Sequence, residues 1–216
     1  MEQRQTIFDP RRHGWPFANI YPYRMGIGPL RIPPSIILGF CGGMVFSALD
    51  RFYAREPMPA TGPAPVQGEP LFYALLRRQR QTLNGGVMLR TWRWQVKSDA
   101  ELARLTTEEW ATVKRSIDAG HPVVICLIRA EGAFGKVWEN HQVVVCGYRQ
   151  DPSSGRVTIS IYDPNWRNTP GVTIQFTPGA ASLDGRQYAP NGAENHRMRG
   201  FFVIPYDRPN PALPPT

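Results

Sequence analysis

Hydrophobic positions recur at helical spacing in three stretches of the first half of the chain. Residues 42–55 carry five large apolar side chains at near-helical intervals, which is typical of one buried helix face. Residues 71–83 carry two adjacent apolar ridges of the same kind. Residues 106–120 begin with a Thr-Thr-Glu-Glu cap and end at a glycine. The pattern predicts one helix in each stretch.

From residue 122 onward the pattern changes to short apolar runs, which predict β-strands. The runs cover residues 122–128, 142–148, 157–162, 172–176 and 201–206, with a Gly- and Asn-rich loop before the last. Residues 150–155, between the second and third runs, have the composition of a tight hairpin turn. Helices first and antiparallel strands afterwards indicate an α+β fold, with an N-terminal helical half packed on a C-terminal sheet.

Three stretches lack a regular pattern. Residues 1–34 are rich in proline, glycine, arginine and aromatic residues, and we expect an ordered but irregular approach. Residues 56–70 hold five prolines and predict a surface loop, and residues 207–216 predict a frayed tail. No internal repeat is visible. A length of 216 residues is enough for a substantial core, so we expect a single domain over residues 1–216.

The positive charge of the chain is not concentrated in one segment. The net charge is +8, and nearly all the basic residues are arginines. The densest group is Arg-Arg-Gln-Arg at 77–80, which a solvated helix face explains equally well. We therefore expect no nucleic-acid partner.

Neither the N-terminal residues nor the longest apolar run predicts a targeting or membrane segment. The N-terminal residues lack the apolar segment of a secretory signal peptide. The longest apolar run, residues 35–49, is too short for a membrane span and contains three glycines. We expect no membrane span and a cytoplasmic location. A compact basic chain is also compatible with export by a dedicated secretion system.

The three cysteines differ in their surroundings. An odd number of cysteines without a signal peptide indicates free thiols in a reducing compartment. Cys126 and Cys146 lie within apolar strand-like runs, where a free cysteine is usually a small buried hydrophobe. Cys41 lies instead where an extended segment gives way to a predicted helix, and Gly42-Gly43 follow it. No Cys-x-x-Cys or His-x-x-x-His spacing is present, so we expect no structural zinc site.

Two polar residues are predicted to meet at one edge of the sheet. His141 lies just before one predicted strand and Asp163 just after its antiparallel partner, so the hairpin brings them together. A thiol is a good nucleophile as thiolate, which a helix N-terminus and an imidazole both stabilise. An acid then holds the imidazole in the useful tautomer. The order Cys41, His141, Asp163 is therefore typical of a thiol hydrolase.

Each of these residues also has an ordinary structural explanation. A cysteine alone is more often a buried hydrophobe, a histidine alone is more often a capping or hydrogen-bonded residue, and Asp163-Pro164-Asn165 alone is ordinary turn chemistry. The two glycines after Cys41 favour the functional interpretation, because they let the backbone approach a substrate closely. Taken together and in this order, the three residues favour function.

These motifs resemble those of the papain-like cysteine peptidases. The similarity is greatest to the compact bacterial peptidases of the bacteriocin-processing (double-glycine) type and their stand-alone relatives. It covers residues 13–206 and rests on Cys-Gly opening a helix, on Ile-Asp-Ala-Gly-His-Pro-Val-Val at 117–124, on His141 before a Val-rich strand, and on Tyr-Asp-Pro at 162–164. The resemblance implies a papain-like fold in which Cys41 is the nucleophile, His141 the base and Asp163 the orienting acid, with Asn165 as the fallback for that third role. It implies no metal and no organic cofactor.

The chain departs from the papain pattern at two positions. Papain relatives usually carry a glutamine six residues before the cysteine, as an oxyanion donor, and this position is Ser35. They often have an aromatic residue directly after the cysteine, where this chain has Gly42. The substitute donor that we infer is Asn19, together with the backbone N–H of Cys41. Alternatively, Asn19 caps a turn and has no role as an oxyanion donor.

The sequence therefore predicts a cysteine-dependent hydrolase that cleaves a peptide or amide bond in a protein or peptide substrate. One alternative with the same fold is a deamidase or transglutaminase-like acyl-transfer toxin or effector that acts on protein. Another is a non-catalytic binding module that retains the fold and binds through surface aromatic residues such as Trp15 or Trp166.

Overall fold

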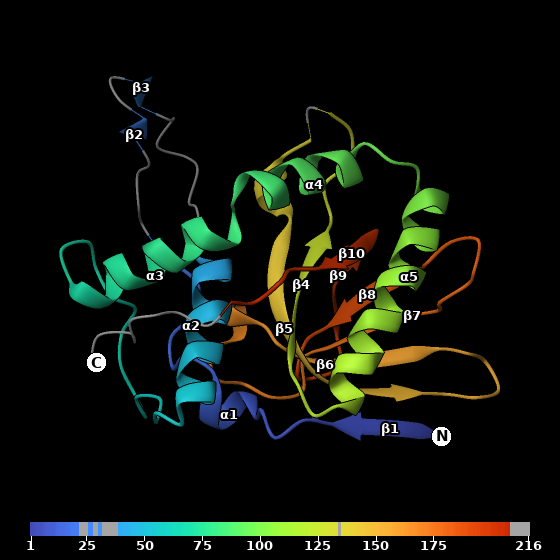
Figure 1. The fold of residues 1–216 in the computed structure, drawn as a ribbon, viewed down its shortest axis with the longest axis horizontal. Coiled ribbons are helices and arrows are strands. Elements are labelled where there is room, and N and C mark those ends of the chain that lie inside the picture. Colours follow the sequence, from blue (N-terminus) through green and yellow to red (C-terminus); the bar gives the residue numbers. More distant parts are fainter. Residues whose placement is uncertain (22–25, 28–29, 32–38, 134, 208–216) are drawn as a thin grey trace.

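The computed structural model describes residues 1–21, 26–27, 30–31, 39–133 and 135–207. Part of the segment expected to be irregular, including Ser35, lies outside the described residues, as does nearly all of the expected frayed tail. The described residues form a mixed α+β fold with one large antiparallel sheet (Figure 1).

The helices lie mainly in the first half of the chain. They are α1 (Pro10–His13), α2 (Cys41–Ala54), α3 (Pro70–Thr82), α4 (Gly85–Gln95) and α5 (Asp99–Asp118), with short 3-10 turns η1 (Val137–Glu139) and η2 (Pro164–Trp166). The predicted helices at 42–55 and 71–83 are confirmed as α2 and α3, each shifted by one residue. The helix α4 was not predicted. Its N-cap is Asn84, whose side chain accepts a hydrogen bond from the N–H of Val87.

The start of α5 corrects the predicted helix at 106–120. The Thr-Thr-Glu-Glu sequence is not a cap but lies inside the helix, which begins seven residues earlier at Asp99. The capping box is formed by Ser98 and Glu101, because each side chain bonds the backbone N–H of the other residue. Thr106 is buried within α5, and its hydroxyl accepts a hydrogen bond from the N–H of Phe201.

Eight strands form the main sheet. They are β1 (Glu2–Gln5), β4 (Val123–Ile128), β5 (His141–Gln150), β6 (Val157–Tyr162), β7 (Thr173–Phe176), β8 (Gly185–Tyr188), β9 (Glu194–Met198) and β10 (Gly200–Val203). A separate pair, β2 (Gly26–Ile27) and β3 (Leu30–Arg31), lies apart from it. The order in the sheet is β10-β4-β5-β6-β7-β8-β9, and β1 pairs with β5; all the pairs are antiparallel.

All five predicted strands are present; β6 has the predicted bounds, and each of the other four has at least one shifted end. Three further strands of the main sheet, and the separate pair β2 and β3, were not predicted. The strand β1 lies in the segment expected to be irregular, and β8 and β9 lie in the segment expected to be a Gly- and Asn-rich loop. The strand β9 has four exposed residues of five, so it lacks the apolar run by which the other strands were recognised.

The core has two clusters, one on each face of the sheet. The first contains Met44 of α2 together with Val144 of β5. The second contains Trp110 of α5 together with Val143, the preceding residue of the same strand. Alternate residues of a strand point to opposite faces, so β5 is buried on both faces. Figure 1 shows α2 and α3 to the left of these strands and α5 to their right.

The N-terminal segment packs against both halves of the molecule. The indole N–H of Trp15 donates to the hydroxyl of Ser47 in α2 at 2.9 Å, and its backbone N–H donates to the hydroxyl of Tyr162 in β6 at 3.1 Å. Trp15 is 0% exposed, so its assignment as a surface aromatic was wrong. It belongs to the core, where it joins α2 to the sheet.

Within the described residues, no helix is both long enough and apolar enough to cross a membrane.

Candidate active site

Cys41 is the first residue of α2, the position that the sequence analysis expected. Its side chain is half-buried, whereas Cys126 and Cys146 are fully buried in β4 and β5. The partial positive charge of a helix N-terminus favours an anion at such a position. Of the three thiols, Cys41 is therefore the one placed to react as a thiolate.

The two glycines after Cys41 lie where α2 packs closely on its neighbours. A Cβ on Gly43 would lie 2.2 Å from the carbonyl oxygen of Leu75, so this position lets α2 pack closely on α3. The N–H of Gly43 donates to the side-chain oxygen of Gln79 in α3 at 2.7 Å. The glycine pair thus fits α2 against α3, and its predicted use in substrate approach stays a prediction.

The surroundings of Cys41 lower the pKa of its thiol. Burial acts in the opposite direction, but a hydrogen bond to the His141 ring, the imidazolium charge, and the backbone N–H groups of Gln142 and Gly42 outweigh it. For Cys126 and Cys146, burial dominates and raises the pKa to about 12. The same desolvation thus acts on all three cysteines, and only Cys41 has a cation that reverses its effect.

His141 is held at the start of β5 by the residue before it. The side-chain oxygen of Asn140 accepts the backbone N–H groups of Arg129 and Ala130, at 3.0 and 3.2 Å, and its amide donates to Gln95 of α4. These bonds tie both ends of the loop between β4 and β5 together. The His141 ring, 5% exposed, is therefore built into the wall of the site and does not lie on a free loop.

His141 and Asp163 form a short charged contact. The His141 Nε2 lies 2.7 Å from the Asp163 Oδ1, which leaves Nδ1 for the Cys41 sulfur. Burial opposes the charge on His141, but Asp163 and Cys41 outweigh it and raise its pKa to about 9. Burial also opposes the charge on Asp163, but His141, the Asn165 N–H and Arg129 lower its pKa to about 2. Both groups are therefore charged at neutral pH.

A β-bulge places the two side chains on the same face of the sheet. The pairing of β5 with β6 shifts by one residue between Val145 and Gly147, so Cys146 is an extra residue in β5. After the shift, Asp163 comes opposite a β5 residue two places from His141, and residues two places apart share a face. Without the bulge, Asp163 would lie opposite a β5 residue whose side chain points to the other face of the sheet from His141. The predicted hairpin correctly brought His141 and Asp163 to the same edge of the sheet. The bulge then places their side chains on the same face of the sheet.

Asp163, and not its alternative Asn165, contacts the imidazole. The N–H of Asn165 donates to Asp163 Oδ1 at 2.9 Å, and the Asn165 side-chain oxygen accepts from Asn19 at 3.2 Å. Asn165 therefore supports Asp163 through its backbone and Asn19 through its side chain.

Asn19 lies beside the start of α2, where the inferred oxyanion donor has to be. Its side-chain oxygen accepts the N–H of Phe40, the residue before Cys41, at 2.6 Å. This bond directs the amide nitrogen away from Phe40, and one of its two hydrogens goes to Asn165. A Cβ on Gly39 would lie 2.3 Å from that nitrogen, so the glycine makes the room that Asn19 occupies.

Two residues of this cluster were not predicted. Gln187 of β8 donates its side-chain amide to Asp163 Oδ2 at 2.7 Å, and Arg129, just after β4, donates to the Gln187 side-chain oxygen at 2.5 Å. Gln187 was assigned to a loop, although buried and half-buried residues alternate along β8. The buried positions are Gly185 and Gln187, so the sequence of β8 carries no apolar alternation by which the strand could have been found.

The other histidines lie outside the contact between Cys41 and Asp163. His13 ends α1 and accepts the N–H of Asp9 at its Nδ1. His196 is exposed on β9, where its backbone pairs with Gln187, and His121 is exposed after α5. Across the described parts of the chain, no group of three or more His, Cys, Asp or Glu side chains could hold a metal ion.

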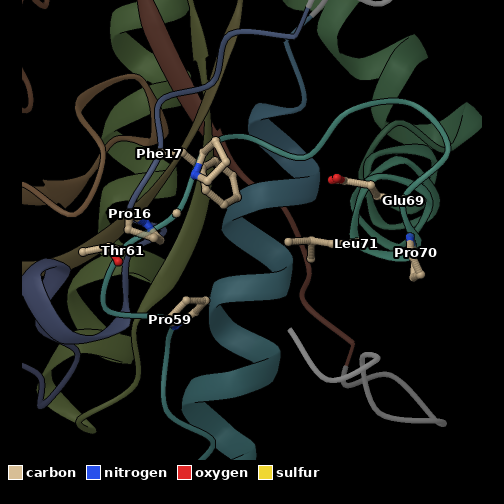
Figure 2. A pocket seen from close by; sticks show the side chains of 9 residues that line it. Pro16, Phe17, Pro59, Thr61, Glu69, Pro70 and Leu71 are labelled. Atoms are coloured by element: carbon tan, nitrogen blue, oxygen red, sulfur yellow. The ribbon is translucent and has the colours of Figure 1, made fainter.

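A pocket of about 560 Å³ lies along α2, apart from these residues. Figure 2 shows Pro16, Phe17, Pro59 and Thr61 on one side of the helix and Leu71 on the other. The lining does not include Cys41, His141, Asp163 or Asn19.

Comparison with protein-family models, with curated proteins and with solved structures finds no match to this chain. The argument for function therefore depends on the geometry and chemistry of the site.

Proposed function

We propose that this chain is a cysteine-dependent hydrolase of papain-like fold that cleaves a peptide or amide bond. The observation that supports it most is the contact series from Cys41 at the start of α2, through the buried His141 ring, to Asp163 at 2.7 Å. Three residues that are far apart in the sequence meet in the order that nucleophile, base and orienting acid require. A core-packing role does not call for two charged groups at this depth.

In the proposed reaction, His141 holds the proton of Cys41 and the thiolate attacks the carbonyl carbon of the substrate. A C–S bond forms while the carbonyl oxygen becomes an oxyanion. When the carbonyl forms again, the C–N bond breaks, and the leaving amine takes the proton from His141. His141 then removes a proton from water, whose oxygen attacks the thioester and releases the acid and the Cys41 thiolate.

Two donors are available for the oxyanion. The Asn19 amide has one hydrogen that is not used by Asn165, and the backbone N–H of Cys41 lies at the helix start beside it. Both belong to rigid parts of the structure, because Asn19 is held at its oxygen by Phe40 and at its backbone by Pro164. The proposed partner is a protein or peptide substrate, and the mechanism uses no metal or organic cofactor.

The test is the appearance of new chain ends in a mixed protein substrate. The purified chain is incubated with an unfolded bacterial proteome, and new N-termini are identified by labelling and mass spectrometry. Wild type should generate termini that share a recognisable sequence on one or both sides of the cut. Cys41→Ala removes the nucleophile and should generate none.

Cys126→Ala is the matched control, because Cys126 is a fully buried thiol of β4 whose pKa burial raises, so it is not placed to react as a thiolate. It should cleave as the wild type does, provided that circular dichroism shows all three proteins folded. Identical products from wild type and Cys41→Ala, or no products from either, would contradict the proposal.

A further inference from the structure

We propose that Gln187, held by Arg129, is a positioning residue that fixes the Asp163 carboxylate against His141. The inference rests on the proposed function, because it concerns the same site. It adds a second layer to that site, formed by β8 and by the end of β4, which the sequence analysis did not assign to function.

The first argument is the set of hydrogen bonds that Asp163 accepts from the described residues. Its Oδ1 accepts the ring of His141 at 2.7 Å and the N–H of Asn165 at 2.9 Å, and its Oδ2 accepts the amide of Gln187 at 2.7 Å. Asp163 is 1% exposed, so water does not replace a missing donor easily. Gln187 is the only donor shown for Oδ2 among the described residues. Its bond therefore decides how the carboxylate is rotated toward His141.

The second argument is that Arg129 fixes the direction of the Gln187 amide. A glutamine side chain can turn over and exchange its oxygen and nitrogen, which would place an acceptor against the carboxylate. The Arg129 guanidinium has donors and no acceptor, and it lies 2.5 Å from the Gln187 oxygen. The oxygen therefore faces Arg129 and the NH₂ group faces Asp163. Gln187 is itself 1% exposed, so this arrangement is enclosed.

The third argument is that Gln187 lies on a strand that is paired on both sides, although the pairing of β8 with β9 shifts register just after it. It lies in β8, and its backbone pairs with Ile174 of β7 and His196 of β9. The charged or titratable groups that interact with Arg129 or Asp163 here are His141, the exposed His196, and the thiols of Cys41 and Cys126. A catalytic group is held precisely when the residues behind it are locked by packing and hydrogen bonds. The pairing of β8 with β7 and β9 therefore holds the Gln187 backbone in place.

The first test is the rate of Cys41 alkylation by iodoacetamide against pH, with each modified cysteine identified by peptide mass spectrometry. Gln187→Met keeps the length of the side chain and changes no charge, but it leaves Asp163 Oδ2 without its donor. A looser carboxylate orients the imidazolium less well, so the thiolate is less stabilised. We expect the rate of Cys41 alkylation near pH 6 to fall at least about tenfold. The acid limb of the pH–rate curve, where the thiolate is lost, should move to higher pH.

The matched control is Gln175→Met on β7. Gln175 is the residue after Ile174, so it points to the opposite face of the sheet from the one that Gln187 occupies. The rate of Cys41 alkylation in Gln175→Met should stay within about twofold of the wild-type rate. A merely structural role for Gln187 predicts a lower unfolding temperature with no change in the pH limb, and that result would overturn the inference.

A second pair of variants covers the case in which Gln187→Met does not fold. Arg129→Met removes the group that orients the Gln187 amide, and Arg129→Lys keeps a cation and a donor at that place. The rate should fall several-fold in the first variant and recover in the second to within about twofold of wild type. Equal rates in both Arg129 variants and wild type would overturn the inference.

These readouts need no substrate, so they separate the two proposals. If wild-type Cys41 alkylates no faster than Cys126, the proposed function fails. If wild-type Cys41 is fast and Gln187→Met is equally fast, the positioning role of Gln187 fails alone.

Discussion

At the residue scale, the site depends on three charges that burial alone would suppress. The thiol of Cys41, the ring of His141 and the carboxyl of Asp163 all lose hydration, and in each case this opposes ionisation. Each becomes charged because the next group in the series carries the opposite charge. The three residues therefore act as a unit, and the removal of one changes the titration of the others.

This coupling predicts an unusually basic histidine. The pKa of His141 is raised to about 9, whereas burial lowers the pKa values of His13 and His196 below the ordinary value. Above pH 9 the imidazolium therefore loses its proton, and below it the ring stays charged. In an NMR titration of the histidine ring protons, one resonance should have its midpoint near pH 9.

Asp163→Asn removes the negative charge and should move that midpoint down by more than one pH unit, since burial then acts with less opposition. The resonances of His13 and His196 serve as internal controls and should not move by a comparable amount. If no histidine titrates above pH 8, or if Asp163→Asn leaves the midpoint in place, the buried ion pair is not formed.

At the element scale, the sequence pattern was informative where packing is local and failed where it is not. Helices α2 and α3 and the strands β4 to β6 follow from apolar spacing. The strands β1 and β9 are polar and form because a neighbouring edge accepts them, which no pattern within four or five residues reveals. The cap of α5 was predicted at the wrong place because Thr-Thr-Glu-Glu has the composition of a helix cap. In the structure, the Thr106 hydroxyl instead accepts a buried hydrogen bond from the N–H of Phe201.

The same distinction holds for the candidate site. The sequence predicted Cys41, His141 and Asp163 from chain order and hairpin geometry. It did not predict Gln187 or Arg129, because their contacts cross the sheet and involve no motif. The bulge at Cys146 was also beyond a pattern argument, because a run of apolar residues looks the same with or without one extra residue.

The close packing of α2 on α3 gives a prediction about stability. Gly43→Ala places a Cβ 2.2 Å from the Leu75 carbonyl oxygen, so the two helices must separate. We expect a loss of about 1–3 kcal/mol in the free energy of unfolding, measured by urea denaturation.

Gly85→Ala is the control at the start of α4, where a Cβ meets nothing within 4 Å. It should be neutral, or stabilising by about 0.5–1 kcal/mol, because alanine loses less backbone entropy in a helix. Equal losses in the two variants would show that glycine is not required for the contact between α2 and α3.

At the scale of the whole molecule, a buried ion pair joins the helical half to the end of the chain. Arg78 of α3 lies 2.6 Å from the Asp50 carboxylate of α2, and the Tyr206 hydroxyl donates to the same oxygen at 2.7 Å. Arg78 also donates to the carbonyl of Asp207 and lies over the Phe46 ring. Helices α2 and α3 and the segment after β10 thus meet at one buried charge pair.

Arg78→Met should lower the free energy of unfolding by about 3–5 kcal/mol, because it leaves the Asp50 carboxylate buried without its cation. Asp50→Leu combined with Arg78→Met removes both charges and should recover at least half of that loss. Urea denaturation of the two variants provides the measurement. A double variant less stable than Arg78→Met would show that the unpaired charge is not the cause.

The account depends most on the activation of Cys41 by His141, and selective alkylation tests that claim most directly. Folded wild type is treated with iodoacetamide near pH 6, where an ordinary thiol is almost entirely protonated. We predict that Cys41 is modified at least about tenfold faster than Cys126 and Cys146, and that His141→Ala lowers the Cys41 rate at least about tenfold. Similar rates at all three cysteines in the folded wild type, or an undiminished Cys41 rate in folded His141→Ala, would contradict the account.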